Sequence, residues 1–192
     1  SMYASIEDIP LNSPCRDRQN VEGPNSIREM GRKGKLNIRG NAEDASFSEG
    51  IQKALGLTLP VKPNTFTEYH SRRLFWLGPD EWLLHCDLDD TGTLSHDLAT
   101  ALDGVHHAVT EVSDYYGVIR LRGPDAVALL RKGSPLDFHH TKFPTGNIAQ
   151  TRFGHASVLL HYHDDGETWD IHVRWSFAEY VWDYLVSGLR AL

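Results

Sequence analysis

The sequence predicts an α+β protein in which one arrangement of strands and helices occurs twice. Hydrophobic periodicity indicates the order strand, helix, hairpin, helix from about residue 35, and the same order returns from about residue 106. The two halves also open alike, with NIRGNAEDASFSEGIQKALG in the first and RLRGPDAVALLRKG in the second. Helices packed on one face of mostly antiparallel strands are typical of ferredoxin-like units. We therefore expect two ferredoxin-like half-domains with mostly antiparallel sheets.

The first half, about residues 35–105, begins with the short strand KLNIRG. A helix follows, because apolar residues recur at helical spacing until Gly56 stops the pattern. The run RRLFWLGPDEWLLHC is typical of a hairpin, since Gly78 and Pro79 stand between two apolar stretches. The run TLSHDLATAL then predicts a second helix.

The second half, about residues 106–192, repeats this order. HHAVTEVSDYYGVIRLRG predicts two strands, and PDAVALLRKG predicts a helix between Pro124 and Gly133. IAQTRF, ASVLLHYH and TWDIHVRW predict three further strands. A final helix with a buried apolar stripe is expected to start at a capping box of Ser176 and Glu179.

Residues 1–34 are polar, contain Pro and Gly, and show no sustained periodicity. This pattern predicts a leader that is flexible or ordered only by a partner, followed by a single compact module over residues 35–192. Cys15 is expected to be an incidental thiol of the leader, and Cys86 a small core residue. Two cysteines without zinc-ligand spacing are compatible with a reducing compartment.

Charge and hydropathy argue against several classes of protein. The formal net charge of -7 is unfavourable for a general nucleic-acid binder, which needs a basic surface. No apolar run approaches the length of a membrane span, and the N-terminus lacks the apolar core of a signal peptide. We expect a cytoplasmic protein that binds neither nucleic acid nor membrane.

The stretch VLLHYHDDGETWDIHVRW places three histidines around an acidic turn and raises the question of a metal site. Asp-Gly pairs favour two-residue hairpin turns, so we expect Asp165 and Gly166 to form the turn. His163 then lies opposite Thr168. Side chains alternate across a strand, so the polar and apolar residues of this hairpin separate onto opposite faces.

One face of the expected hairpin is the core, and the other receives the polar residues His161, His163, His172 and Asp170. Neighbours on that face could close around an ion, because diagonal pairs lie about 7–8 Å apart. No fourth ligand and no residue that would orient the histidines can be identified. We therefore expect a solvated or subunit-contacting face without a metal, and metal binding by the histidines remains the alternative.

The sequence contains no self-contained catalytic or nucleotide-binding motif. G-x-G-x-x-G, Walker, H-E-x-x-H and G-x-S-x-G patterns are absent. Four arginines could hold an anionic ligand or a partner carboxylate, although separate exposed arginines are the favoured interpretation: Arg120, Arg122, Arg152 and Arg174. We assign no catalytic residue and no metal ligand, and the cofactor-binding residues stay unknown.

Two long runs, AVTEVSDYYGVIRLRGPDAVALLRKGSPLDF and FPTGNIAQTRFGHASVLLHYHDDGETWDIHVRWSFAEYVWDYL, resemble the gamma subunit of heterotetrameric sarcosine oxidase. The resemblance covers most of residues 74–189 and includes LGPDEWLL. That subunit family is itself similar to the folate-binding module of the glycine-cleavage aminomethyltransferase. The pattern of this module is echoed by Ser113, Gly117 and the run from Gly123 to Ala126. The resemblance implies an aminomethyltransferase-like fold.

The resemblance implies an accessory subunit, without an active site of its own, in an oxidoreductase of sarcosine catabolism and one-carbon metabolism. Such an assembly demethylates sarcosine to glycine, with oxygen as electron acceptor and tetrahydrofolate as acceptor of the one-carbon unit. The related transferases have an acidic residue at the folate site, and the corresponding run GHASVLLHY carries none.

The resemblance further implies the alpha, beta and delta subunits as partners, with this chain packed on the large alpha subunit. FAD, FMN, NAD, zinc and tetrahydrofolate then belong to the other subunits of the assembly. The alternative is a free-standing folate-binding or aminomethyltransferase-like protein.

Overall fold

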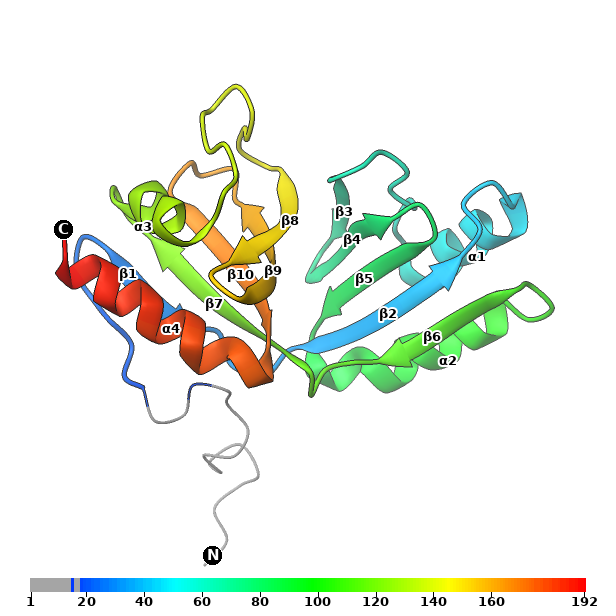
Figure 1. Ribbon diagram of the computed structural model, residues 1–192. Coiled ribbons are helices and arrows are strands. Elements are labelled where there is room, and N and C mark those ends of the chain that lie inside the picture. The colour runs from blue at the N-terminus through cyan, green and yellow to red at the C-terminus, as the bar shows by residue number, and fades with distance from the viewer. Residues whose placement is uncertain (1–14, 16–17) are drawn as a thin grey trace, which may run out of the picture. The chain divides into compact units, whose positions relative to one another are not determined.

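A computed structural model describes Cys15 and residues 18–192, which divide into two units (Figure 1). The central unit is Lys33–Ser113, and the terminal unit combines the described residues up to Arg32 with Asp114–Leu192. Each unit has one antiparallel five-stranded sheet and its own hydrophobic core. The expected α+β class with two mostly antiparallel, ferredoxin-like halves is confirmed.

The central unit follows the chain order of a ferredoxin-like unit. Its elements are β2 (Gly34–Gly40), α1 (Ala45–Leu55), β3 (Phe66–Tyr69), β4 (Arg72–Gly78), β5 (Glu81–Cys86), a 3-10 turn (Leu88–Asp90), α2 (Thr91–Ala101) and β6 (His107–Glu111). The sheet order is β3-β4-β5-β2-β6, so the strand, helix, hairpin, helix, strand pattern is complete and β3 is added at one edge. Because β6 pairs with β2, the chain leaves this unit at Ser113, later than the expected boundary near residue 105.

The terminal unit repeats this layout with one change. Its elements are β1 (Ser26–Glu29), β7 (Tyr116–Arg122), α3 (Ala126–Gly133), β8 (Ile148–Phe153), β9 (Ala156–Tyr162), β10 (Thr168–Arg174) and α4 (Trp175–Arg190). The sheet order is β1-β7-β10-β9-β8. The edge strand next to β7 is therefore β1, which precedes the central unit in the sequence. In the central unit, the edge strand next to β2 is β6, which follows α2.

The segment Ser26–Glu29 corrects the expectation of a leader through residue 34. These residues form β1, in which Ile27 is fully buried and lies opposite Leu121 of β7. On the other side of β1, Val21 and Ile27 exchange two backbone hydrogen bonds of 2.9 and 3.0 Å. A four-residue strand is too short to show periodicity, which explains why the pattern of the sequence did not indicate it.

Cys15 is also part of the terminal unit, where it is 2% exposed and belongs to the hydrophobic core. Burial, together with the nearby Glu29 carboxylate, raises the pKa of its thiol to about 12. Cys15 is thus a core residue and not an incidental thiol, and it stays protonated and unreactive at neutral pH. Residues 1–14, 16 and 17 of the expected leader lie outside the described part of the chain.

Local signals in the sequence account for α1. The Asp44 side chain accepts a hydrogen bond of 2.9 Å from the Ser46 N–H at the start of the helix. Gly56 ends the helix with φ 71°, a left-handed conformation that glycine adopts without strain, and its N–H donates to the Gln52 carbonyl. Phe47 packs against Trp82 of β5 in the central core, with ring centroids 5.6 Å apart.

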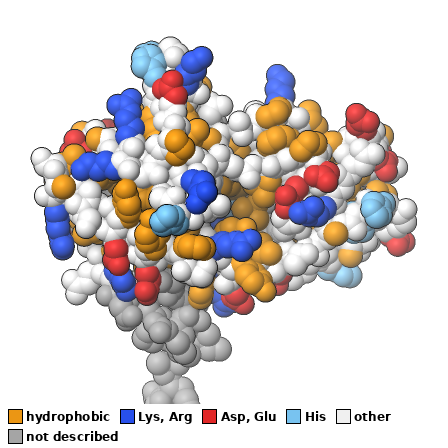
Figure 2. Space-filling model, viewed as in Figure 1, with side chains coloured by type: hydrophobic (Ala, Val, Ile, Leu, Met, Phe, Trp, Pro, Cys, Tyr) orange, Lys and Arg blue, Asp and Glu red, His pale blue; other side chains and the backbone are white. Residues whose placement is uncertain are grey.

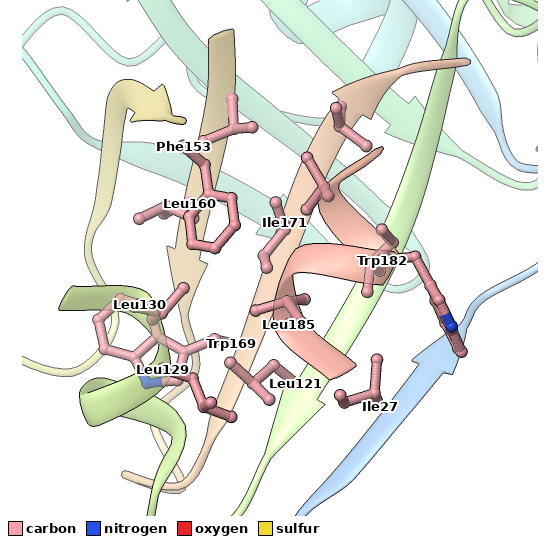
Figure 3. Packing of buried hydrophobic residues seen from close by; sticks show 14 of the residues in the cluster. Ile27, Leu121, Leu129, Leu130, Phe153, Leu160, Trp169, Ile171, Trp182 and Leu185 are labelled. Atoms are coloured by element: carbon pink, nitrogen blue, oxygen red, sulfur yellow. The ribbon is translucent and has the colours of Figure 1, made fainter. Parts of the chain in front are cut away.

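In the terminal unit, α4 packs against β7 and β10 and buries Leu185 beside Ile171, with Trp182 in the same core on the side of β1 (Figure 3). The expected capping box does not form, because β10 passes directly into α4 at Trp175 and no side chain caps the helix. Glu179 instead forms an ion pair with Arg18. None of the helices in the described residues is long and apolar enough to cross a membrane.

Ile27→Ala tests whether β1 is an integral part of the terminal unit. We expect the free energy of unfolding to fall by about 3 kcal/mol, because the change leaves a cavity at a fully buried position. Urea unfolding followed by tryptophan fluorescence measures this loss. Val61→Ala, at a position that is 62% exposed, is the control and should change stability by less than about 0.5 kcal/mol. Equal stability of the two variants would contradict the assignment of β1.

Candidate functional site

The β9–β10 hairpin has the register that the sequence predicts. His161 lies opposite Asp170, and Leu159 lies opposite His172. The alternation places Trp169 in the hydrophobic core, so the polar residues of the two strands share the opposite face of the sheet.

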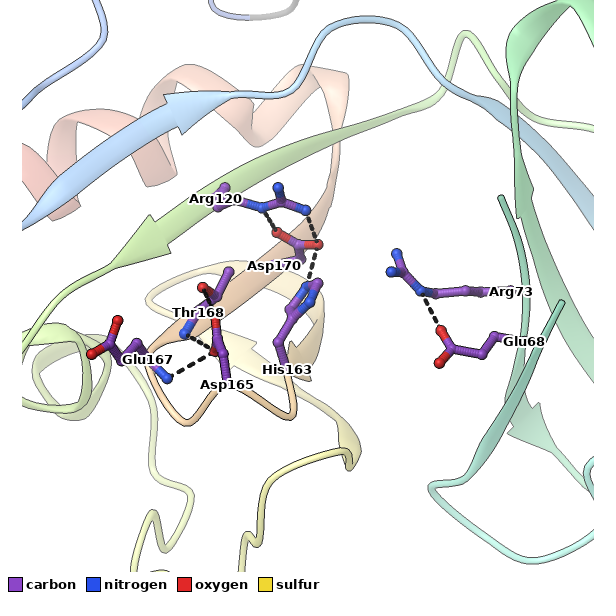
Figure 4. Close-up of polar contacts among 8 residues, drawn as sticks. All are labelled: Glu68, Arg73, Arg120, His163, Asp165, Glu167, Thr168 and Asp170. Carbon is purple, nitrogen blue, oxygen red and sulfur yellow. Dashed lines mark hydrogen bonds and ion pairs between the residues drawn. The ribbon is translucent and has the colours of Figure 1, made fainter. Parts of the chain in front are cut away.

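The turn of this hairpin differs from the expected two-residue turn. Four residues separate His163 from Thr168, and the Gly166 N–H donates to the His163 carbonyl at 3.2 Å with Gly166 at φ 72°. The Asp165 carboxylate accepts hydrogen bonds from the Glu167 N–H and from both the N–H and the hydroxyl of Thr168 (Figure 4). Side-chain bonds to the backbone therefore replace the tight Asp-Gly turn and still keep the register.

The polar face is buried, which corrects the expectation of a solvated outer face. Asp170 is 1% exposed, His172 2% and His161 3%, while the His163 side chain is 18% exposed. The sequence pattern identified correctly which side chains share a face. It could not indicate the exposure of that face, because alternation distinguishes the two faces of a strand without showing what covers them.

Asp170 is the centre of a charged network on this face (Figure 4). The Arg120 Nε donates to Oδ1 at 2.8 Å and its Nη2 donates to Oδ2 at 3.0 Å, a two-point pairing of guanidinium and carboxylate. The His163 Nε2 lies 2.7 Å from Oδ2 and donates to it, since an ionised carboxylate only accepts. The His161 ring stacks on the His163 ring with centroids 4.2 Å apart.

Hydrogen bonding determines the charge state of Asp170. Burial raises the pKa of this carboxyl group, but the hydrogen bonds from His163 and Arg120 lower it by more and hold it well below its usual range. Asp170 is therefore a carboxylate at neutral pH, and the network contains a buried negative charge that Arg120 balances.

The same cluster offers the metal-ligand atoms that the alternative interpretation of the sequence requires. Atoms of His161, His163 and Asp170 all lie within 4.8 Å of one another. However, both Asp170 oxygens already accept hydrogen bonds from Arg120 or His163. A divalent cation would have to displace these donors and lie beside the positive charge of Arg120. The residues thus fit an internal ion pair better than a zinc or nickel site.

The four arginines singled out in the sequence do not form one anion site. Arg120 holds Asp170, and Arg122 holds Glu167 in an exposed ion pair of 2.9 Å. Arg152 lies on β8, and Arg174 lies at the end of β10. Two of the four arginines therefore bind carboxylates of this chain.

The pattern of the sequence did not indicate the pairing of Arg120 with Asp170. The two residues lie directly opposite each other on β7 and β10, which are neighbours in the sheet although the helix α3 and two strands separate them in the chain. When β8 is counted as the strand added at one edge, β7 and β10 take the positions of the first and third strands of a ferredoxin-like unit. The strand order of such a unit makes these two strands neighbours. That order, combined with the opposite charges, is the signal that could have identified the pair.

Ser113, Gly117 and Gly123, which carried the resemblance, have structural roles. The Lys35 N–H donates to the Ser113 hydroxyl at 2.9 Å, and Gly117 is a buried residue of β7. Gly123 has φ 136°, and a Cβ atom there would lie 2.4 Å from the Asn25 side chain. This close approach lets Asn25 accept a hydrogen bond from the Asp125 N–H, which ties the residue before β1 to the start of α3.

The fold places the chain in a class of α+β proteins with paired ferredoxin-like units. The structure of the glycine cleavage system aminomethyltransferase T from Bartonella henselae is similar with a TM-score of 0.60 and 13% identity, over 83% of this chain and 45% of that one. The regulatory subunit of aspartate kinase from Thermus thermophilus is similar with a TM-score of 0.50 and 8% identity, over 88% of this chain and 99% of that one. At these identities the likeness shows the fold alone, and it confirms the expected aminomethyltransferase-like architecture.

Closer similarity identifies the family within this class. A chain of the heterotetrameric sarcosine oxidase from Corynebacterium sp. U-96 has a TM-score of 0.84 and 26% identity, over 93% of this chain and 94% of that one. The sarcosine oxidase subunit gamma of Corynebacterium sp. (strain U-96) is 27% identical over 85% of this chain and 78% of its own length. The corresponding subunit of Arthrobacter sp. is 27% identical over 85% and 79%. The model of the sarcosine oxidase gamma subunit family matches residues 39–189, and the chain belongs to this family.

Asp170→Asn tests the contribution of the buried network. The change keeps the shape of the side chain but leaves Arg120 without its negative partner, so the free energy of unfolding should fall by about 2 kcal/mol at pH 7. Because the folded pKa of Asp170 is depressed, the carboxylate stabilises above its unfolded pKa of about 3.9, and this contribution is lost as the pH falls through the folded pKa. The difference from wild type should therefore be present at pH 5 and shrink below about pH 4. Urea unfolding at several pH values measures it.

Glu167→Gln is the matched control for this variant. The Arg122–Glu167 pair lies in solvent, with both side chains more than half exposed, so its loss should change stability by less than about 0.5 kcal/mol. If Asp170→Asn were as stable as this control, the buried network would not stabilise the fold.

Metal content tests the assignment of the histidine cluster as an ion pair. We expect wild-type protein and the double variant His161→Ala, His163→Ala to retain equal zinc after incubation with zinc and dialysis, because Arg120 occupies the carboxylate. Elemental analysis of both proteins measures the content. One zinc per wild-type chain that disappears in the double variant would show that the cluster is a metal site.

Proposed function

We propose that this chain is a non-catalytic subunit of a heterotetrameric sarcosine oxidase and that it packs on the large alpha subunit. The observation that carries the proposal is the likeness, over nearly the whole chain, to one chain of a solved heterotetrameric sarcosine oxidase. Family membership supports the same role. The alpha, beta and delta subunits are the proposed partners, and the cytoplasm is the proposed location.

The chemistry of the described residues supports an accessory role. The candidate site consists of an aspartate held by an arginine and a histidine of the same unit, an arrangement that stabilises the sheet. The sequence carries no dinucleotide-binding fingerprint, and the cluster closest to a metal site fits an ion pair better. We therefore assign FAD, FMN, NAD, zinc and tetrahydrofolate to the other subunits. No described residue favours the alternative of a free-standing folate-binding or aminomethyltransferase-like protein.

Exposed aromatic side chains of the terminal unit support docking to a partner. Tyr115 is 64% exposed and Phe177 39% exposed, and the Trp175 N–H donates to the Tyr115 carbonyl at 2.8 Å. Figure 2 shows hydrophobic side chains at the surface on the face along which α4 runs. Large exposed aromatic residues are enriched among the residues that dominate protein interfaces.

Co-expression with the alpha, beta and delta subunits tests the proposed function. We expect all four chains to co-purify through a tag on this chain, and sarcosine oxidation to depend on its presence. Size-exclusion chromatography and oxygen uptake measure assembly and turnover. A complex of the other three subunits that forms and turns over fully without this chain would contradict the proposal.

A further inference from the structure

The two units have an equivalent edge strand, and described residues cover only one of the two. β1 lies beside β7 as β6 lies beside β2, at the end of each sheet. Val21 covers the outer side of β1 through its two hydrogen bonds with Ile27. Within the described part of the chain, no strand or bridge lies beyond β6 (Figure 1). The repeat thus provides an internal comparison between a covered and an uncovered edge.

The register shows which backbone groups of β6 point away from the sheet. The Val112 N–H donates to the Lys35 carbonyl of the neighbouring strand at 2.9 Å. Because backbone groups alternate in direction along an antiparallel strand, the N–H and C=O groups of His107, Val109 and Glu111 point outward. These groups can pair with an added strand without disturbing the bonds to β2.

β6 lacks several of the features that prevent an edge strand from pairing, although it is short and ends in the charged residue Glu111. It contains no lysine and no proline, and its register with β2 runs from His107 to Glu111 without a bulge. Ala108 and Thr110 are exposed, so side chains of this unit do not shield the edge. Such an edge is a template for an extended peptide, whose affinity comes from main-chain hydrogen bonds.

A groove of about 780 Å³ lies at the start of β6 and can receive side chains of an added strand. Ala108, Pro79 and Val61 contribute apolar surface, and Val61 is 62% exposed. In β-strand addition, pockets of this kind select alternate side chains of the bound segment.

The charge of the groove indicates the chemistry of the segment that it would bind. Arg39 is held by Glu81 at 3.2 Å, so its positive charge is balanced. Glu43 and Asp80 line the same groove and are exposed, and no described cation forms an ion pair with either. The groove therefore presents two carboxylates to an occupant, and a basic side chain complements them.

We propose that β6 pairs with an extended segment of another subunit of the oxidase, and that a basic side chain of this segment lies against Glu43 and Asp80. The inference rests on the proposed function, which supplies the partner subunits. The equivalent position in the terminal unit is taken by the backbone around Val21, whereas none of the residues that the structure describes pairs with the outer side of β6.

Val109→Pro tests the backbone pairing, because it removes an outward N–H and leaves the hydrogen bonds to β2 in place. Val109→Thr is the matched control, since it alters the same side chain but keeps the N–H. Each variant is co-expressed with wild-type chain of different mass and with the alpha, beta and delta subunits. Intact-mass spectrometry then compares the variant fraction in the purified complex with that in the soluble pool. We expect depletion of the proline variant by about tenfold, and incorporation of the threonine variant within about twofold of wild type.

Glu43→Gln combined with Asp80→Asn tests the charge of the groove in the same competition. We expect depletion by about threefold at low salt and none at about 1 M salt, as for an exposed ion pair. Thermal unfolding of each isolated variant tests whether it folds. A midpoint close to that of the wild-type chain shows that a depleted variant is folded and that its depletion reflects weaker assembly.

The outcomes separate this inference from the proposed function. If the wild-type chain assembles and the proline variant is incorporated equally, the inference is overturned and the proposed function stands. Failure of the wild-type chain to assemble overturns both. A dimer of the isolated chain that Val109→Pro dissociates in analytical ultracentrifugation would show that β6 pairs with a second copy, and would overturn the assignment to another subunit.

Discussion

The pairing of β1 with β7 is the constraint on which the terminal unit depends. β7 is a central strand, and the backbone groups on its β1 side need a partner because the strand is buried: Val118 is 2% exposed, and its carbonyl accepts a hydrogen bond of 3.0 Å from the Met30 N–H just beyond β1. β1 supplies that partner and buries Ile27 against the same core. The Asn25 contacts at Gly123 and Asp125 then fix the start of β1 beside α3. A short segment before the central unit thus completes a sheet whose other strands all follow that unit.

The buried network around Asp170 gives the neighbouring strands a second means of alignment. A slip of one residue between β7 and β10 would separate Arg120 from Asp170 and leave a carboxylate without its counter-charge. Separating the members of a buried ion pair is unfavourable because it leaves a buried charge without compensation. We interpret the network as an interaction that specifies the register of the two central strands, β7 and β10.

Much of the fold follows from the sequence, and its omissions have physical causes. Periodicity and turn residues indicated the strands and helices of residues 35–192 except the four-residue strand β3 (Phe66–Tyr69), and the alternation around His161 indicated the correct hairpin register. Ser26–Glu29 was missed because four residues carry no period, and Ser176 was wrongly assigned to a cap because the helix starts directly at the end of β10. The Arg120–Asp170 pair was missed for another reason: it depends on strand order, which is a non-local property of the chain. The burial of the polar face is non-local in the same way.

The position of β1 has a consequence for the order of folding on the ribosome. β1 is synthesised before the central unit, but its partner β7 emerges only after that unit is complete. The central unit contains all five of its strands in one continuous stretch and can close first. Throughout this interval the sheet that buries Ile27 is incomplete, so the apolar side chain of β1 has no core to pack against. During synthesis, the backbone edge and the apolar side chain of β1 therefore stay unpaired until β7 and the strands after it have been made.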